Sequence, residues 1–194
     1  MPASKPRSNR GPAAAAENRR AIITAARQLF TERGLHVPLS AIARQAGVGQ
    51  GVFYRHFPTR LALALTVFED NFAELESIAA DADVTTFAQL WHRLVEMTIE
   101  SAAFMEMVIA ARRSLPDYDG PERIRNIIAA PLHLAQQAGL LRPDLSVQDV
   151  LLAERMVYGA VISAPDAGDV RPTVERALAL IDLPIPAESD TGQP

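Results

Sequence analysis

One short segment, Leu39–Phe57 (LSAIARQAGVGQGVFYRHF), constrains the fold of this chain more than any other. Its first part spaces four apolar residues as on one face of a short helix: Leu39, Ile42, Ala43 and Ala46. Gly47 follows, and glycine readily takes the left-handed conformation that ends a helix. A second short helix is predicted to begin near Gln50 and to bury Phe53 and Phe57. Two short helices joined by a glycine turn form a helix-turn-helix, whose second helix can enter the major groove of DNA.

The positive charge of the chain is concentrated at its N-terminal end. Residues 1–60 contain ten basic and two acidic side chains, a net charge of +8, although the whole chain carries −4. The remaining residues contain nine basic and 21 acidic side chains. A basic end on an acidic chain favours a polyanion as the partner of that end. Together with the helix-turn-helix, this asymmetry predicts binding to double-stranded DNA.

Other classes of protein are disfavoured by what the sequence lacks. Without cysteine there are no disulfides or thiolate metal sites, so we expect a cytoplasmic protein with no metal and no cofactor. No signal-peptide core and no membrane-length apolar run is present, so no membrane contact is expected. The four histidines are scattered, and neither a phosphate-binding loop nor a recognisable nucleophile is found. We therefore predict that the chain is not an enzyme, and keep an all-α enzyme and a helical interaction module without DNA binding as alternatives.

The helical periodicity predicts an all-α chain of four regions. These are a disordered basic arm (1–13), a three-helix helix-turn-helix domain (14–58), a helical effector-binding and dimerisation domain (59–183) and a flexible tail (184–194). Helices are expected at about 14–33, 39–46, 50–56, 59–79, 86–114 with a break near Ser101, 121–138, 146–164 and 172–183. Thr59 is expected to cap the fourth helix, and Thr85 or Thr86 the fifth.

Three blocks within residues 18–65 resemble the DNA-binding domain of the tetracycline-repressor (TetR) family of bacterial regulators. They are AARQLFTERG (25–34), IARQAGV (42–48) and FYRHFPTR (53–60), and the resemblance covers about a quarter of the chain. The segment QAGLLRPD (137–144) also looks like one found before the penultimate long helix of such proteins. The resemblance implies an all-α homodimer with a DNA-binding head, a ligand-binding body and a palindromic operator.

The resemblance places Gln50, Val52, Tyr54 and His56 at the DNA face of the recognition helix, and Arg44 and Arg60 near the DNA backbone. The direct reading agrees for the helix and adds Arg55, which also points away from the buried face. Arg44 and Arg60 would approach phosphates, because long cations supply attraction to the DNA backbone. Gln50 can both donate to and accept from base edges, whereas Val52 offers only an apolar contact, for instance to a thymine methyl group.

The chain departs from the family pattern at three places. Gly49 stands where the family often has a serine or threonine that caps the recognition helix. Pro38 replaces a common capping threonine, and Leu61 with Ala62 replaces an acidic pair. These changes do not alter the expected fold, but they remove side chains that could contact phosphates.

The C-terminal region carries the apolar residues from which an effector cavity could be built. A single methionine or aromatic residue at helical spacing is more often part of the core, but the family resemblance favours a mainly apolar cavity. The candidates are Trp91, Met97, Phe104, Met105, His133 and Met156. They predict a small apolar or aromatic effector, and a ligand-independent DNA-binding regulator is the alternative.

The last two predicted helices are apolar on more than one face, which is more than a helix packed within its own domain needs. We therefore predict a homodimer formed through a four-helix interface. Its candidate residues are Leu151, Gly159, Ile162 and Leu178. The predicted function is that of a homodimeric repressor released from its operator by the effector.

Overall fold

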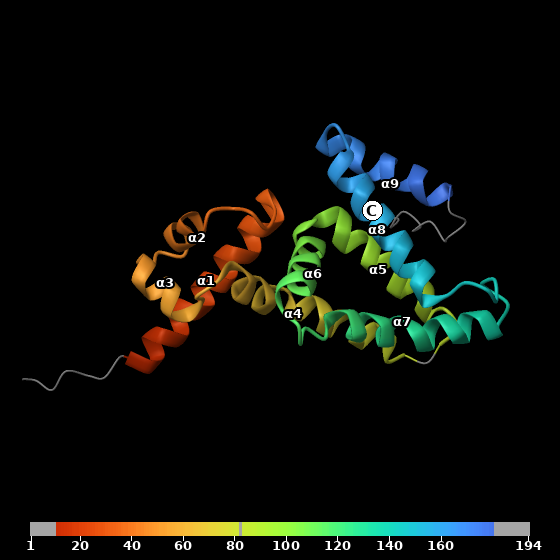
Figure 1. Cartoon of the computed structure of the whole chain (residues 1–194), viewed down its shortest axis with the longest axis horizontal. Helices are drawn as coiled ribbons and strands as arrows, with labels where there is room; N and C mark the ends of the chain where they lie inside the picture. Colours follow the sequence, from red (N-terminus) through yellow and green to blue (C-terminus); the bar gives the residue numbers. More distant parts are fainter. Residues whose placement is uncertain (1–10, 82, 181–194) are drawn as a thin grey trace, which may run out of the picture. The chain divides into compact units, whose positions relative to one another are not determined.

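The computed structural model describes residues 11–81 and 83–180, and all of the regular structure in these ranges is helical (Figure 1). The helices are α1 (Gly11–Arg33), α2 (Leu39–Gln45), α3 (Gln50–His56), α4 (Arg60–Ala79), α5 (Thr86–Glu100), α6 (Ala103–Ser114), α7 (Gly120–Gln137), α8 (Val147–Ser163), a 3-10 turn η1 (Ala167–Asp169) and α9 (Val170–Ala179). The all-α prediction is confirmed, and so is the break near Ser101, which separates α5 from α6. The predicted basic arm, the end of the last helix and the tail lie wholly or largely outside the described residues.

The chain divides into two compact units between Val67 and Phe68, inside α4. We call the described residues up to Val67 the head and those from Phe68 the body. The sequence had placed this boundary at residue 59. The difference has a physical reason: the guanidinium of Arg60 donates hydrogen bonds to the carbonyl oxygens of Leu35 and Val37, which fastens the start of α4 to the head.

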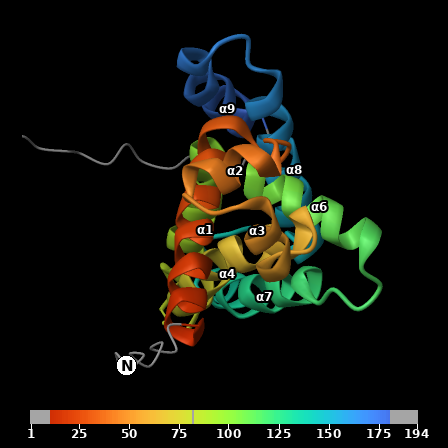
Figure 2. The same ribbon diagram turned by 90° about the vertical axis from the view of Figure 1, so that its left-hand side faces the viewer.

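The head is built around α1, and Figure 2 shows α2 and α3 beside it. Five apolar residues at helical spacing form the buried face of α1: Ile22, Ala25, Ala26, Leu29 and Phe30. Gly47 follows α2 with φ of 68°, the left-handed conformation that the sequence predicted for the turn into α3. Gly34 and Gly139 take the same conformation after α1 and α7.

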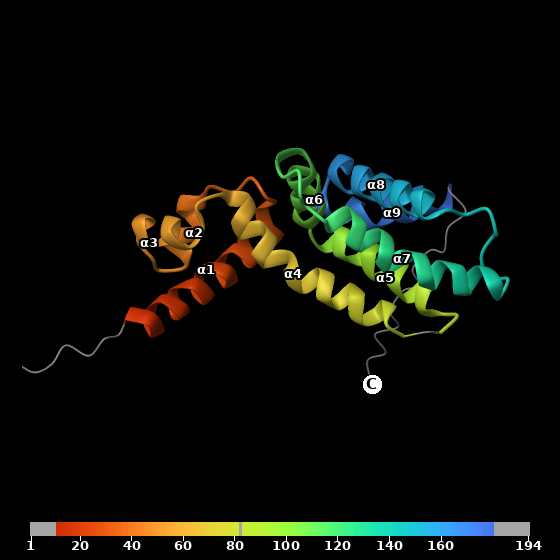
Figure 3. The ribbon, with the colours of Figure 1, turned by 60° about the horizontal axis from the view of Figure 1, so that its bottom comes forward.

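In the body, α5 contacts both α7 and α8 (Figure 3), and α9 packs on α8. The core of the body contains Trp91 with an exposed fraction of 1%. In α4 the apolar residues Phe68, Phe72 and Leu75 are buried, but Leu61 and Leu65 are half-exposed. Their places in the core are taken by Leu63, Ala64 and Val67.

Side chains cap several of these helices. Thr59 accepts from the backbone N–H of Ala62 at 3.1 Å, as predicted. Ser146 and Asp149 form a reciprocal capping box at the start of α8. Thr85 is the N-cap residue of α5, as predicted, but its side chain makes no capping hydrogen bond. The Thr86 hydroxyl donates backwards to the carbonyl of Asp81 at 2.6 Å.

Candidate DNA interface and effector pocket

The recognition helix α3 presents a polar face and buries an aromatic one. Gln50, Tyr54 and Arg55 are exposed, and Val52 and His56 are half-exposed. On the opposite face Phe53 and Phe57 have exposed fractions of only 1% and 2%. All five α3 side chains predicted to face DNA are therefore accessible, and their contacts with DNA remain predictions.

Contacts with α1 hold the buried face of α3 in place. The Phe53 and Phe57 rings lie 6.5 Å apart between centroids, and the Arg19 guanidinium sits 4.5 Å from the centre of the Phe57 ring. In the preceding helix, Gln45 donates to the side-chain oxygen of Gln28 on α1 at 2.8 Å. The helix that would enter a groove is thus anchored on its inner side by aromatic packing and a cation–π contact, and the polar tie fastens the preceding helix α2 to α1.

The arginines of the predicted DNA face differ in what they contact. Arg44 is exposed and forms no ion pair with any residue that the structure describes. Arg55 is also exposed, and its Nε donates to the carbonyl of Gly51 at 3.3 Å. Arg60 is half-buried and ties the 35–37 loop to α4, a structural role that the sequence did not signal. The contact of Arg60 with a phosphate remains a prediction, and it is distinct from this structural role.

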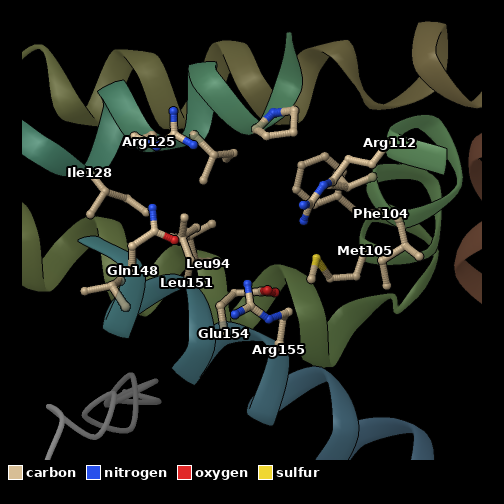
Figure 4. A pocket seen from close by; sticks show the side chains of 15 residues that line it. Leu94, Phe104, Met105, Arg112, Arg125, Ile128, Gln148, Leu151, Glu154 and Arg155 are labelled. Carbon is tan, nitrogen blue, oxygen red and sulfur yellow. The ribbon is translucent and has the colours of Figure 1, made fainter. Parts of the chain in front are cut away.

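The body contains a pocket of about 310 Å³ among α5, α6, α7 and α8 (Figure 4). Its apolar lining consists of Leu94, Phe104, Met105, Val108, Ile109, Pro121, Ile124, Ile128, Val150 and Leu151. Its polar lining consists of Arg112, Arg125, Gln148, Glu154 and Arg155. The volume lies at the lower end of the range for small-molecule sites, roughly 300–1,000 Å³.

Of the residues predicted to bind an effector, the structure brings Phe104 and Met105 to this pocket. Trp91 and Met97 are buried in the core but do not line it, and Met156 is 42% exposed. His133 is exposed, with its Nε2 3.0 Å from the amide nitrogen of Gln137. The structure does not bring these four residues to the pocket, because helical periodicity indicates which residues are covered but cannot show where the packing leaves a gap.

The predicted dimer residues also fall into different places. Leu178 is fully buried within the protomer, so its side chain is not available to a second subunit. Leu151 is half-buried and lines the pocket. Gly159 and Ile162 lie on accessible parts of α8, where Ile162 is 58% exposed. Leu152, which the sequence analysis did not single out, and Met156, which it predicted to bind an effector, are also exposed on this helix.

Glu154 is the one acidic residue in the lining of the pocket, and its carboxyl group is buried. Burial raises its pKa to about 7, and the hydroxyl of Thr98, 3.0 Å from Oε1, opposes this effect only in part. The same hydroxyl lies 3.1 Å from the carbonyl oxygen of Leu94 and has a single proton to share. The site therefore favours the neutral carboxyl.

Replacing Glu154 with glutamine should remove a pH dependence of stability. The folded carboxyl keeps a proton that the unfolded chain loses, so the free energy of unfolding should fall as pH rises from about 4.5 to about 7 and level off above. The shift corresponds to about 3 kcal/mol. Urea unfolding across this range should show the slope in the wild type and in Glu122→Gln, an exposed control, and lose it in Glu154→Gln. An unchanged slope in Glu154→Gln would contradict the assignment.

Two features are absent from the residues that the structure describes. No helix among them is both long and apolar enough to cross a membrane. Nor do the same residues contain a cluster of three or more His, Asp or Glu side chains that could hold a metal ion. The head presents the accessible recognition helix α3, and the body contains the pocket.

Comparison with known proteins gives the family. Residues 22–67 match the model of the bacterial regulatory proteins of the tetR family, and this match ends where the head ends. A TetR transcriptional regulator from Streptomyces coelicolor is 29% identical, with a TM-score of 0.56 over 84% of this chain and 95% of that one. Residues 22–67 therefore belong to the TetR family of transcriptional regulators, and the chain as a whole is similar to solved regulators of that family.

Two other solved structures have the same fold. A TetR regulatory protein from Mycobacterium vanbaalenii is 28% identical, with a TM-score of 0.50 over 76% of this chain and 96% of that one. The TetR-family protein CprB from S. coelicolor A3(2) is 22% identical, with a TM-score of 0.59 over 87% and 88% of the two chains, and this likeness concerns the fold alone. No curated protein matches the chain.

Proposed function

We propose that this chain is a homodimeric transcriptional repressor that leaves a palindromic operator when a small effector occupies the pocket of its body. The observation that carries the proposal is the accessible polar face of α3 in an N-terminal region of net charge +8. The pocket in a separate unit supplies the second site that effector control requires.

Residues on α8 support the proposed dimer. Leu152, Met156 and Gly159 fall on one stripe of the helix by their spacing, and Leu152 and Met156 are 49% and 42% exposed. A Cβ added at Gly159 would meet open space, so nothing packed within the protomer requires a glycine there. Glycine within a helix costs about 1 kcal/mol relative to alanine. Close approach of a second copy of α8 would account for both the glycine and the exposed apolar side chains.

A chain of contacts through α4 could couple the two sites. Phe104 lines the pocket, and its ring lies 5.4 Å from that of Phe72 and 5.7 Å from that of Phe68, both on α4. The same helix begins at Arg60, which is tied to the loop before α2. An effector that moves Phe104 would therefore act on a helix that starts at the DNA-binding unit, with a typical coupling of about 1–3 kcal/mol.

Two substitutions in the head should separate the reading of bases from phosphate attraction. Arg44→Ala should weaken binding to all sequences alike and lower the salt dependence by about one unit, since one phosphate contact is lost. Gln50→Ala should instead relax discrimination at a single base pair, by about 1–3 kcal/mol. Fluorescence anisotropy with operator variants at several salt concentrations measures both. A uniform loss for Gln50→Ala would contradict the assignment of base reading.

The proposal as a whole is tested by selecting genomic fragments with the purified full chain. We expect a palindromic sequence to be enriched, and we expect it to be bound by a dimer and released by small molecules that occupy the pocket. No sequence-selective binding would favour a helical interaction module. Binding that no pocket ligand weakens would favour a ligand-independent regulator.

A further inference from the structure

Three arginines from three different helices surround the pocket of the body. Arg112 comes from α6, Arg125 from α7 and Arg155 from α8, and all three are exposed. Figure 4 shows the Arg112 side chain directed into the space between these helices, across from the amide of Gln148. The charged groups therefore lie at the rim of the pocket.

None of these three guanidinium groups is in a close ion pair, although the chain beyond residue 60 has 21 acidic and only nine basic side chains, and only Arg155 acts electrostatically on the Glu154 carboxyl. Four other arginines of the body are paired, for example Arg93 with Glu74 at 2.6 Å and Arg123 with Glu69 and Glu76 at about 3 Å, whereas Arg113 and Arg176, which do not line the pocket, form no ion pair with the described residues either. Arg112, Arg125 and Arg155 form no ion pair with any part of the chain that the structure describes. An acidic body thus keeps unpaired positive charge around one cavity.

The single carboxyl group of the lining does not balance this charge. Glu154 lies at the buried side of the pocket, and burial raises its pKa to about 7, so a large part of the population is neutral at physiological pH. The rest of that side is apolar and includes the buried Leu94, Phe104, Ile124 and Ile128. The pocket is therefore positive at its rim and apolar at its base.

We propose that this pocket binds an amphipathic carboxylate. Arginines at the rim of the pocket hold the carboxylate group, and the short apolar tail of the ligand lies against the buried base of the pocket. Guanidinium groups bind carboxylates through paired, charge-assisted hydrogen bonds, and an unpaired arginine at a partly enclosed site is suited to this role. This inference rests on the proposed function and sharpens it, because the sequence alone predicted an effector that was only apolar or aromatic.

The test compares small molecules that have the same alkyl chain and differ in their polar end group. Isothermal titration of the full chain with octanoate, octanol and octylamine should show binding of octanoate, about tenfold or more weaker binding of octanol, and no binding of octylamine. Comparing the affinities of straight-chain carboxylates from hexanoate to dodecanoate shows which length of alkyl chain the pocket accepts best. Equal binding of octanol and octanoate would overturn the proposal, and so would a failure of every carboxylate in the series to bind.

Variants then locate the carboxylate. Arg112→Gln, Arg125→Gln and Arg155→Gln are compared with Arg113→Gln, an exposed neighbour on α6 that does not line the pocket. At least one lining variant should lose about tenfold or more in octanoate affinity, and Arg113→Gln should lose little. If no lining variant differs from Arg113→Gln, the proposal is wrong. Operator binding without octanoate is measured on the same proteins, so the regulator proposal fails only if that binding is absent.

Discussion

Replacing Phe53 with alanine should unfold the helix-turn-helix and abolish DNA binding. Its side chain is 1% exposed, packs against Phe57 and fixes α3 on the head. Loss of a buried phenylalanine costs about 3–5 kcal/mol, which is a large fraction of the stability of a unit of this size. Calorimetry of the full chain should show the transition of the head moved to a lower temperature, and electrophoretic mobility shift should show no bound DNA.

The neighbouring aromatic residue provides the matched control. Tyr54 is 50% exposed and belongs to the opposite, accessible face of α3. Tyr54→Ala should therefore leave the thermal transition of the head nearly unchanged while weakening operator binding. If Tyr54→Ala unfolds the head, or if Phe53→Ala leaves it stable, the assignment of inner and outer faces on α3 is wrong.

The head could be predicted from the sequence because its signals are local. Gly47 ends α2, and the spacing of Phe53 and Phe57 fixes the inner face of α3 within a few residues. The tie between Arg60 and the 35–37 carbonyl oxygens left no such signal, because it joins residues more than twenty positions apart. That tie moves the boundary of the head into α4.

The sequence predicted that the body contains a mainly apolar pocket, but it did not predict most of the residues that line it. Apolar spacing correctly marked Trp91, Met97 and Phe104 as covered, yet only Phe104 faces the gap that the packing leaves. The rim arginines look in the sequence like an ordinary solvated surface. Only the three-dimensional arrangement brings Arg112 and Arg155 to one opening, and this is why the expected effector changes from an apolar molecule to an amphipathic carboxylate.

Gly159→Arg should convert the proposed dimer into a monomer and abolish high-affinity operator binding. The position is open within the protomer, so the arginine should not disturb the fold, and replacing a helical glycine favours the helix. At a two-fold interface the same substitution places two cations, one from each subunit, between closely approaching helices. Light scattering should show the protomer mass, with the helical circular dichroism of the wild type retained. A monomer contacts only one half-site, so operator affinity should fall by orders of magnitude while weak, salt-sensitive binding persists.

Gly168→Arg is the control for the added charge, because Gly168 is also exposed with open space around its Cβ position but lies in η1, away from the exposed stripe of α8. It should remain dimeric and bind the operator like the wild type. The two variants have the same net charge, so a difference between them isolates the position on α8 from general electrostatic effects. A Gly159→Arg protein that stays dimeric would remove α8 from the interface. A wild-type protein that is folded and monomeric in solution would contradict the proposed dimer. Two monomers would then have to bind the two half-sites of the operator independently.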